Sequence, residues 1–386
     1  MNKNNGLQEV YITHTAAFLP NHPVGNDEME NVLGRVGDLP SRTRQRILRS
    51  NGIHTRYYAI DPDTRQATHS CADLAAQAVQ QLFAQGVSSQ DLDVLACATS
   101  YPDQTMPGHG AMVHGLLSAD GIACEMVSTA GVCTAGMTAL KHAYNAIRTG
   151  EHQSAIACAA EAASAVMRKE AFTSETASKL AADFRPELAF EKDFLRWMLS
   201  DGAGAVHLSN RPSGNSLRIV WLDLVSYAHE QPVCMYAGGD VAADGTFRGW
   251  KTFSPDERET QSAMAVKQNV KLLNENIVHY TLEKALSRSI QKHGLRLDDV
   301  DFFLPHYSSH YFRDKMAQGL ANIGFPISED KWFTNLASKG NTGSASIYIM
   351  LDEFLRQHTL QSGQKILCYV PESGRFSSAF MLLEKV

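Results

Sequence analysis

Residues 128–147 read STAGVCTAGMTALKHAYNAI, and the rest of the fold is organised around this stretch. A short β-prone run at residues 123–127 precedes it, and an alanine-rich segment without proline follows Cys133. Small residues on both sides of Cys133 let the backbone turn sharply and let a helix pack closely behind the turn. The stretch therefore predicts a strand, a tight turn that carries a cysteine, and then a helix.

The position of Cys133 predicts chemistry as well as structure. At the start of a helix the unpaired N–H groups and the macrodipole favour a thiolate, so we expect a lowered thiol pKa and a nucleophile at neutral pH. The alternative is that Cys133 is a small buried apolar residue, as most free cysteines are. The stretch alone leaves both interpretations open.

The composition is that of an ordinary globular protein. The chain has 386 residues, 44% hydrophobic and 20% charged, which is enough for two domains or one large pseudo-symmetric body. The formal net charge of −6 argues against a general nucleic-acid binder. We find no signal-peptide pattern and no apolar stretch as long as a membrane span. The 7 cysteines are scattered without a CxxC pair, which favours reduced thiols and a cytoplasmic location over disulfides or a zinc site.

Strand-like and helix-like segments alternate along the chain, which predicts an α/β fold with a largely parallel central sheet. Residues 163–198 break the alternation and resemble an inserted helical cap, and the polar residues 209–217 mark a boundary between halves 1–210 and 211–386. The expected strands are 8–19, 92–98, 123–127, 154–160, 200–210, 216–226, 300–305, 366–370 and 378–384. The expected helices are a short one capped by Asn26, then 68–86, 257–292, 311–323 and 343–357.

Two charged features are candidates for function. Ligands of α/β sheets gather at the carboxyl ends of strands, so Glu161, which ends the strand 154–160, is either a site residue or an ordinary exposed acid. The most cationic part of this acidic chain is a second feature, and it is either a solvated helix face or a docking point for phosphate or an acidic carrier protein. Its arginines are Arg42, Arg44, Arg46, Arg49 and Arg56.

Two further polar residues occupy places comparable to that of Cys133. His306 follows the apolar strand VDFFLP, and Asn341 lies in SKGNTGSAS before a helix. A histidine after a strand is commonly a structural hydrogen-bonding group, and an asparagine before Thr-Gly is commonly a turn residue. His306 and His310 are four residues apart, but without further ligands nearby they do not indicate a metal site.

With these motifs in place, the chain resembles the β-ketoacyl-carrier-protein synthase III group of the thiolase superfamily. The resemblance covers nearly the whole chain, through STAGVCTAGM, SDGAGAVHLS, LPHYSSHYF and GNTGSAS. It implies a five-layered αβαβα body with two pseudo-symmetric halves, usually a homodimer, in fatty acid, polyketide or secondary metabolism. It also implies that acyl groups arrive on coenzyme A or on the phosphopantetheine of an acyl carrier protein.

The chemistry that the resemblance implies requires these residue types. The Cys133 thiolate attacks an acyl thioester and holds the acyl group. His306 Nε2 and Asn341 Nδ2 then donate to the carbonyl of a second thioester and stabilise its enolate, each contributing about 3 kcal/mol. The backbone N–H of Cys133 forms half of the oxyanion hole, and no metal or redox cofactor is needed.

The chain departs from the family at one place. Members commonly carry a Gly-Gly-Gly run before the last strand, where this chain has Pro371-Glu372-Ser373. Ser373 N–H can still complete the oxyanion hole, whereas Pro371 has no N–H to donate.

ILRSNGIHTRYYAID and PESGRFS also resemble ketosynthase-cyclases that make dialkylresorcinol or stilbene-type rings. For such a reaction Glu161 or Glu372 is a candidate base and Arg375 a candidate cation for the enolate. The alternative is that Glu372 and Arg375 pair with each other and close the pocket.

The sequence is therefore compatible with three functions. The first is a condensing enzyme that forms a carbon–carbon bond, with or without ring closure to a cyclohexanedione. The second is a Cys133-dependent acyltransferase to an oxygen or nitrogen acceptor. The third is a non-catalytic partner subunit of another synthase. Retention of Cys133, His306 and Asn341 disfavours the third, and retention of Asn341 favours the first over the second.

Overall fold

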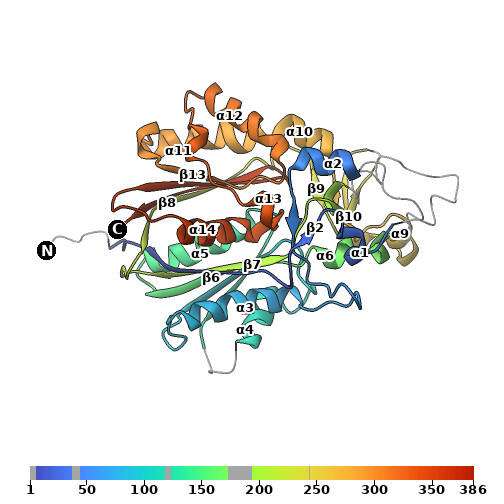
Figure 1. Cartoon of the computed structure of the whole chain (residues 1–386), viewed down its shortest axis with the longest axis horizontal. Coiled ribbons are helices and arrows are strands. Elements are labelled where there is room, and N and C mark those ends of the chain that lie inside the picture. The colour runs from blue at the N-terminus through green and yellow to red at the C-terminus, as the bar shows by residue number, and fades with distance from the viewer. Residues whose placement is uncertain (1–5, 37–43, 118–122, 173–193, 243) are drawn as a thin grey trace.

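Two layers of strands, each with helices on both faces, form the architecture of the computed structural model in Figure 1. α5 and α14 lie between the two strand layers. α3 and α4 cover one outer face, and α10, α11 and α12 cover the other. The structure describes residues 6–36, 44–117, 123–172, 194–242 and 244–386. The predicted five-layered αβαβα fold is confirmed.

The first sheet is built from the first half of the chain. Its strands lie in the spatial order β5-β4-β6-β7-β1. β4 runs parallel to β5 and β6, whereas β7 runs antiparallel to β6 and β1. The strand bounds are β1 Tyr11–Phe18, β4 Val94–Thr99, β5 Glu125–Ala130, β6 Ser154–Glu161 and β7 Gly202–Ser209.

The second sheet repeats this order with strands of the second half, β13-β14-β15-β8. β13 runs parallel to β14, and β15 runs antiparallel to β14 and β8. Trp332 bridges in parallel to Phe303 of β13, where β5 lies beside β4 in the first sheet. A short antiparallel pairing of β1 with β8 joins the sheets. The strand bounds are β8 Leu217–Ser226, β13 Phe302–Pro305, β14 Lys365–Glu372 and β15 Ser377–Lys385.

The prediction of a largely parallel sheet is wrong, because β7 and β15 run against their neighbours in the middle of each half. β14 and β15 are joined by residues 373–376 alone, and strands joined by so short a turn must be antiparallel. The alternation of helices and strands in the sequence does not reveal these two reversals.

Seven longer helices carry the layers within the described part of the chain. Their bounds are α3 Cys71–Ala84, α4 His109–Leu116, α5 Ala135–Arg148, α10 Val270–Val278, α11 Ala285–His293, α12 Arg313–Asn322 and α14 Ser346–Gln357. The shorter elements are β2 Val24–Gly25, α1 Met29–Leu33, α2 Arg44–Asn51, β3 Thr55–Arg56, α6 Ser164–Met167, β9 Met235–Tyr236, β10 Gly239–Val241, β11 Phe247–Gly249, α9 Pro255–Thr260, β12 Lys267–Gln268 and α13 Leu336–Lys339.

Three helix predictions need correction or fall outside the described residues. The single helix expected at 257–292 is divided, because β12 pairs with β9 and the Asn269 side chain then caps α10. A π-helical turn at His279–Lys284 connects α10 to α11. α1 has Glu28 rather than Asn26 at its N-cap. Of the expected cap at 163–198, residues 173–193 lie outside the described part.

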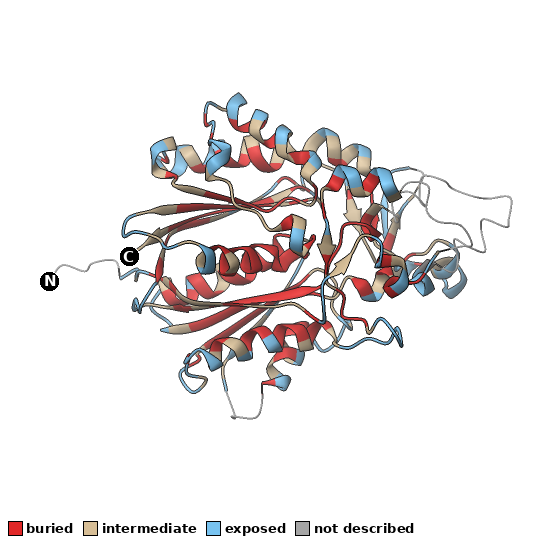
Figure 2. Ribbon diagram, viewed as in Figure 1, coloured by how far each residue is buried: buried red, intermediate tan, exposed pale blue. Residues whose placement is uncertain are grey.

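The core lies along the two central helices, whose inner faces are buried in Figure 2. A Cβ at Gly136 of α5 would lie 2.3 Å from the carbonyl oxygen of Ser344, just before α14. Tyr348 of α14 donates a hydrogen bond to the Gly136 carbonyl at 2.7 Å. The small residues after Cys133 therefore allow the starts of the two helices to meet.

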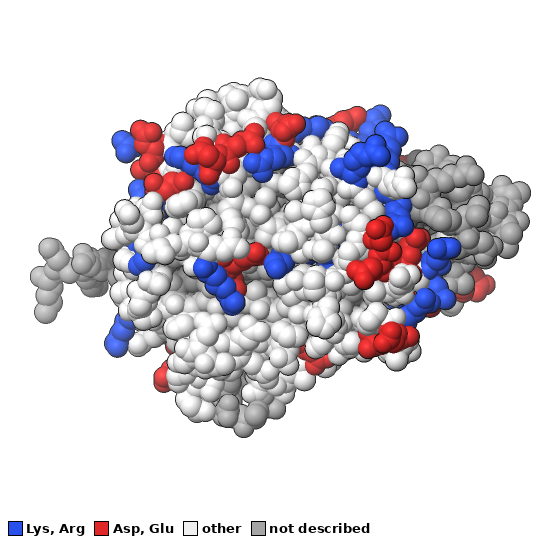
Figure 3. All heavy atoms as spheres, viewed as in Figure 1, with Lys and Arg blue, Asp and Glu red and all other residues white. Residues whose placement is uncertain are grey.

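The surface shown in Figure 3 carries basic and acidic side chains close together, with a group of basic ones over α2. No helix in the described ranges is long and apolar enough to cross a membrane.

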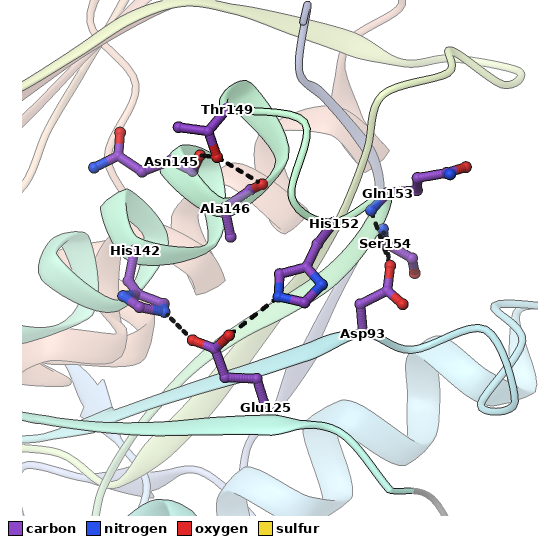
Figure 4. A network of polar contacts seen from close by, with 9 residues as sticks. All are labelled: Asp93, Glu125, His142, Asn145, Ala146, Thr149, His152, Gln153 and Ser154. Carbon is purple, nitrogen blue, oxygen red and sulfur yellow. Dashed lines mark hydrogen bonds and ion pairs between the residues drawn. The ribbon is translucent and has the colours of Figure 1, made fainter. Parts of the chain in front are cut away.

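A polar network links the start of the edge strand β5 to α5 and to the segment that follows α5 (Figure 4). The Glu125 carboxylate accepts hydrogen bonds from His142 Nε2 at 2.9 Å and His152 Nε2 at 3.1 Å. Beside it, Asp93 accepts the backbone N–H groups of Gln153 and Ser154. These contacts tie the start of β5 to α5 and connect the segment between α5 and β6 to the residue before β4.

Candidate active site

One cavity brings together the three residues that the sequence singled out. Cys133 lies in the turn between β5 and α5, His306 follows β13, and Asn341 precedes the 3-10 turn that leads into α14. All three line a single cavity, together with Glu161 and Ser373. The two halves of the chain thus contribute jointly to one site.

The remaining walls of this cavity are mainly apolar. Part of the wall comes from the segment before β7, part from α10, and part from the region of α12. These side chains are Leu195, Met198, Leu199, Leu273, Ile277, Val278, Phe312 and Met316. Such a surface suits a hydrocarbon chain that ends beside a few polar groups.

The Cys133 thiol is held in its protonated form. Burial raises its pKa, and the nearby carboxylates of Glu372 and Glu161 raise it further. The prediction of a lowered thiol pKa is therefore wrong. The helix start is present as expected, but a carboxylate from the other half lies beside it, and the thiol is 9% exposed.

His306 is a neutral imidazole at neutral pH, because burial lowers its pKa to about 4. Its backbone N–H donates to the Tyr369 carbonyl at 2.8 Å, which places the ring at the end of β13. Its ring nitrogens have no hydrogen-bond partner among the described residues. The described residues hold no cluster of three metal-ligating side chains, so His306 and His310 have no such partners there.

Hydrogen bonds fix the orientation of the Asn341 side chain. Its Oδ1 accepts the N–H of Gly343 at 3.0 Å, and its backbone pairs with Met198 and Ser200. With Oδ1 engaged, Nδ2 is the end of the amide that remains available as a donor. Gly343 has a φ of +51°, and a Cβ there would lie 3.0 Å from Glu161.

Glu161 is buried at the end of β6 and is not an ordinary exposed acid. Its Oε1 accepts the N–H and hydroxyl of Ser100 and the N–H and hydroxyl of Ser344. Its Oε2 has no hydrogen-bond donor within the described part of the chain. Burial raises the pKa of this carboxyl group, which leaves a carboxylate of increased basicity in the cavity wall.

The Pro371-Glu372-Ser373 segment divides its side chains between two places. Pro371 and Ser373 line the cavity, and the Ser373 hydroxyl donates to Gln268 Oε1 at 3.3 Å. Glu372 is not among the cavity-lining residues and instead accepts hydrogen bonds from the nucleophile turn. Arg375 is exposed and donates to the Gln231 carbonyl; among the described residues it forms no ion pair with Glu372, whose partners are in the nucleophile turn.

The arginines of the most cationic part of the chain do not form a single surface. Arg46 and Arg49 are exposed on α2, Arg44 is paired with Asp27 and Glu30, and Arg42 lies outside the described residues. The inclusion of Arg56 in a docking surface is wrong. Arg56 is 0% exposed, and its guanidinium donates to Asn26 Oδ1 and the Trp197 carbonyl.

Three hydroxyl residues that hold the site were missed in the sequence. Thr134, Ser100 and Ser344 each donate to a site glutamate. Thr134 and Ser344 lie within the motifs already quoted, but their partners are distant in sequence, so no local pattern indicates the contacts.

The fold and the site define a thiolase-like condensing enzyme, and comparisons with known proteins agree. The family profile "3-Oxoacyl-[acyl-carrier-protein (ACP)] synthase III C terminal" matches residues 290–382. The profile "Beta-ketoacyl synthase, N-terminal domain" matches residues 56–212. The chain belongs to the β-ketoacyl synthase III family of condensing enzymes.

Curated relatives and solved structures match over nearly their full lengths. The beta-ketoacyl-[acyl-carrier-protein] synthase III of Clostridium perfringens is 25% identical over 91% of both chains. The tetronic acid condensing enzyme AbyA1 superposes with a TM-score of 0.74 at 21% identity, covering 97% of this chain and 99% of that one. Xanthomonas campestris OleA, solved with lauric acid and lauroyl-CoA, gives 0.73 at 20% identity, with 98% and 99% covered.

Proposed function

We propose that this enzyme joins two acyl chains through an acyl-Cys133 intermediate, takes a β-ketoacyl-type thioester as second substrate, and closes the product to a cyclohexanedione, the precursor of a dialkylresorcinol. The observation that carries the proposal is the single cavity. Cys133, His306, Asn341 and Glu161 all line this mainly apolar cavity.

The first step is acylation of Cys133. Because the thiol is protonated at rest, a base must take its proton as sulfur attacks the thioester carbonyl. The neutral imidazole of His306 lines the same cavity and is suited to that task. The N–H groups of Cys133 and Ser373 are the proposed oxyanion donors, and the proton leaves with the departing thiol.

The second step is formation of the carbon–carbon bond. Asn341 Nδ2 and a ring N–H of His306 donate to the thioester carbonyl of the second substrate and stabilise its enolate. The α-carbon of the second substrate, acidified by its two carbonyls, loses its proton as the enolate forms. The enolate carbon attacks the acyl carbonyl, the carbon–sulfur bond breaks, and the released Cys133 thiolate takes up a proton to restore the thiol. The fixed orientation of Asn341 supports this role, because its donor end is the one left available.

The third step is ring closure, for which Glu161 is the proposed base. A C–H between two carbonyls is acidic enough for a carboxylate of raised pKa to remove its proton. The carbanion attacks the remaining thioester carbonyl, the carbon–sulfur bond to the carrier breaks, and the departing thiol takes the proton back from Glu161. Glu161 Oε1 is anchored by Ser100 and Ser344, while Oε2 has no donor among the described residues. This arrangement supports Glu161 over Glu372, which does not line the cavity.

The same proposal covers delivery and assembly. Both substrates arrive as thioesters of coenzyme A or of an acyl carrier protein, and the exposed Arg46 and Arg49 on α2 are the proposed contact for the carrier. The thioester chemistry needs no metal or redox cofactor. We further propose a cytoplasmic homodimer. The acyltransferase and non-catalytic alternatives have no observation in the described structure that favours them.

Product analysis tests this function. Wild-type enzyme given two β-ketoacyl thioesters is expected to release a cyclic diketone and to show one acyl adduct, on Cys133, by intact mass and peptide mapping. Glu161→Gln is expected to keep the adduct and to release linear or pyrone-like products. If the wild type releases only linear ketones, the proposed ring closure is wrong and the reaction is condensation alone. If adducts persist in Cys133→Ala, Cys133 is not the nucleophile.

A further inference from the structure

Glu372 binds the turn that carries the nucleophile, although it lies at the opposite end of the sequence. Its Oε2 accepts the N–H of Val132 at 3.3 Å, the N–H of Thr134 at 3.2 Å and the hydroxyl of Thr134. The two N–H groups flank Cys133 directly. A Cβ at Gly131 would lie 3.6 Å from the same oxygen, an ordinary van der Waals distance, so the carboxylate lies directly beside the turn.

The carboxylate also occupies the positive end of α5. Thr134 is the N-cap residue of this helix, and its own side chain makes no capping bond within the helix. Glu372 therefore supplies the acceptor that a helix start requires, from a strand of the other half. An anion at this place is stabilised by the helix macrodipole.

We propose that Glu372 is a positioning residue that clamps both neighbours of Cys133 to β14 and uses the positive end of α5 for its own carboxylate, so that the resting enzyme keeps a thiol rather than a thiolate. This inference rests on Cys133 being the nucleophile of the proposed function. Glu372 needs no contact with the substrate for this role and does not line the cavity.

The consequence for the thiol follows from charge. Burial raises the pKa of the Cys133 thiol, and the negative charges of Glu372 and then Glu161 raise it further, because an anion nearby disfavours the thiolate. Removal of the Glu372 charge must lower the pKa, because the helix end then faces the sulfur without a competing anion. A residue with a merely structural role would change stability without moving this titration.

The test is the pH profile of Cys133 alkylation by iodoacetamide, followed by peptide mass spectrometry. In the wild type the midpoint is expected above about 8.5, the ordinary value for a cysteine. Glu372→Gln is expected to lower the midpoint by one pH unit or more, which is roughly a tenfold higher alkylation rate at pH 7. Glu372→Gly, which restores the glycine common in the family, is expected to do the same.

The matched control is Asp352→Asn. Asp352 is also a buried carboxylate of the second half, but it contacts Thr15 and Arg356 instead of the nucleophile turn. Its removal is expected to leave the midpoint unchanged.

An unchanged midpoint in a folded Glu372→Gln protein would overturn the proposal. If both Glu372 variants fail to fold, the wild type still decides, because a midpoint below about 7 would show that the resting enzyme keeps a thiolate at neutral pH. The alkylation readout requires no turnover. Failure of the proposed function, seen as absence of acylation, is therefore a separate result.

Discussion

Each half of the molecule has a glutamate at the end of the equivalent strand, and each glutamate accepts hydrogen bonds from residues of the other half. β6 ends at Glu161, which accepts hydrogen bonds from Ser344 just before α14. β14 ends at Glu372, which accepts hydrogen bonds from Thr134 just before α5. The strand order of the two sheets makes β6 and β14 equivalent. Each central helix thus begins on a carboxylate supplied by the opposite half.

The difference between the two contacts is where the carboxylate faces. Glu161 lines the cavity, whereas Glu372 does not. The residues at the two helix starts also differ in their proposed roles. Cys133 before α5 is the proposed nucleophile, and Asn341 before α14 is the proposed hydrogen-bond donor. A repeated architecture has therefore produced two similar anchors, and the chemistry depends on which of them lines the cavity.

The strongest test of this comparison replaces the key residue at each helix start. Cys133→Ala is expected to remove both the acyl adduct and the product. Asn341→Ala is expected to keep the adduct but to lose condensation about a hundredfold, because one enolate donor is missing. Intact mass spectrometry and product chromatography measure the two steps separately. Loss of the adduct in Asn341→Ala would show that the two helix starts do not have separate roles.

A smaller effect is expected when each anchor loses one hydroxyl. Thr134→Val and Ser344→Ala each remove one hydrogen bond to a buried carboxylate, which contributes about 2 kcal/mol to the free energy of unfolding. Urea unfolding should show similar losses for both variants. Product analysis should separate them, since the ratio of cyclic to linear product is expected to change in Ser344→Ala alone.

The smallest effect is expected on the surface, away from both anchors. Reversal of Arg46 and Arg49 to Glu should raise the apparent KM for carrier-bound substrates a few-fold, and the effect should shrink at high salt. Arg288→Glu on α11 is the matched control, since that residue is also exposed and α11 lies away from α2 in Figure 1. If the KM for small thioester mimics changes equally, Arg46 and Arg49 do not contact the carrier and belong to an ordinary solvated helix face.

The sequence predicts the fold and the meeting of Cys133, His306 and Asn341, because each residue lies in a motif with recognisable neighbours. It does not predict the state of the thiol. A helix start is visible in the local sequence, but the carboxylate that binds it lies 238 residues from Thr134. The antiparallel reversals of β7 and β15 also depend on tertiary pairing rather than on local pattern.

Charge patterns in the sequence are equally ambiguous. Arg46 and Arg56 look alike in a basic run, yet one is exposed on α2 and the other is buried against Asn26. Burial depends on how α2 and β3 pack on residues such as Trp197, which are distant in the chain. A run of arginines therefore predicts a basic segment without indicating which of its members reach the solvent.

The crossed anchors also set the order in which the site is completed during synthesis. Cys133 and α5 leave the ribosome in the first half of translation, but Glu372 ends β14, the second-to-last strand in the chain. Since N-terminal parts of a protein emerge and fold first, the nascent first half must exist for a time without the carboxylate under its cysteine turn. A message truncated before β14 would encode the cysteine without its anchor. The nucleophile turn is therefore completed only in chains that have been translated almost to their last strand.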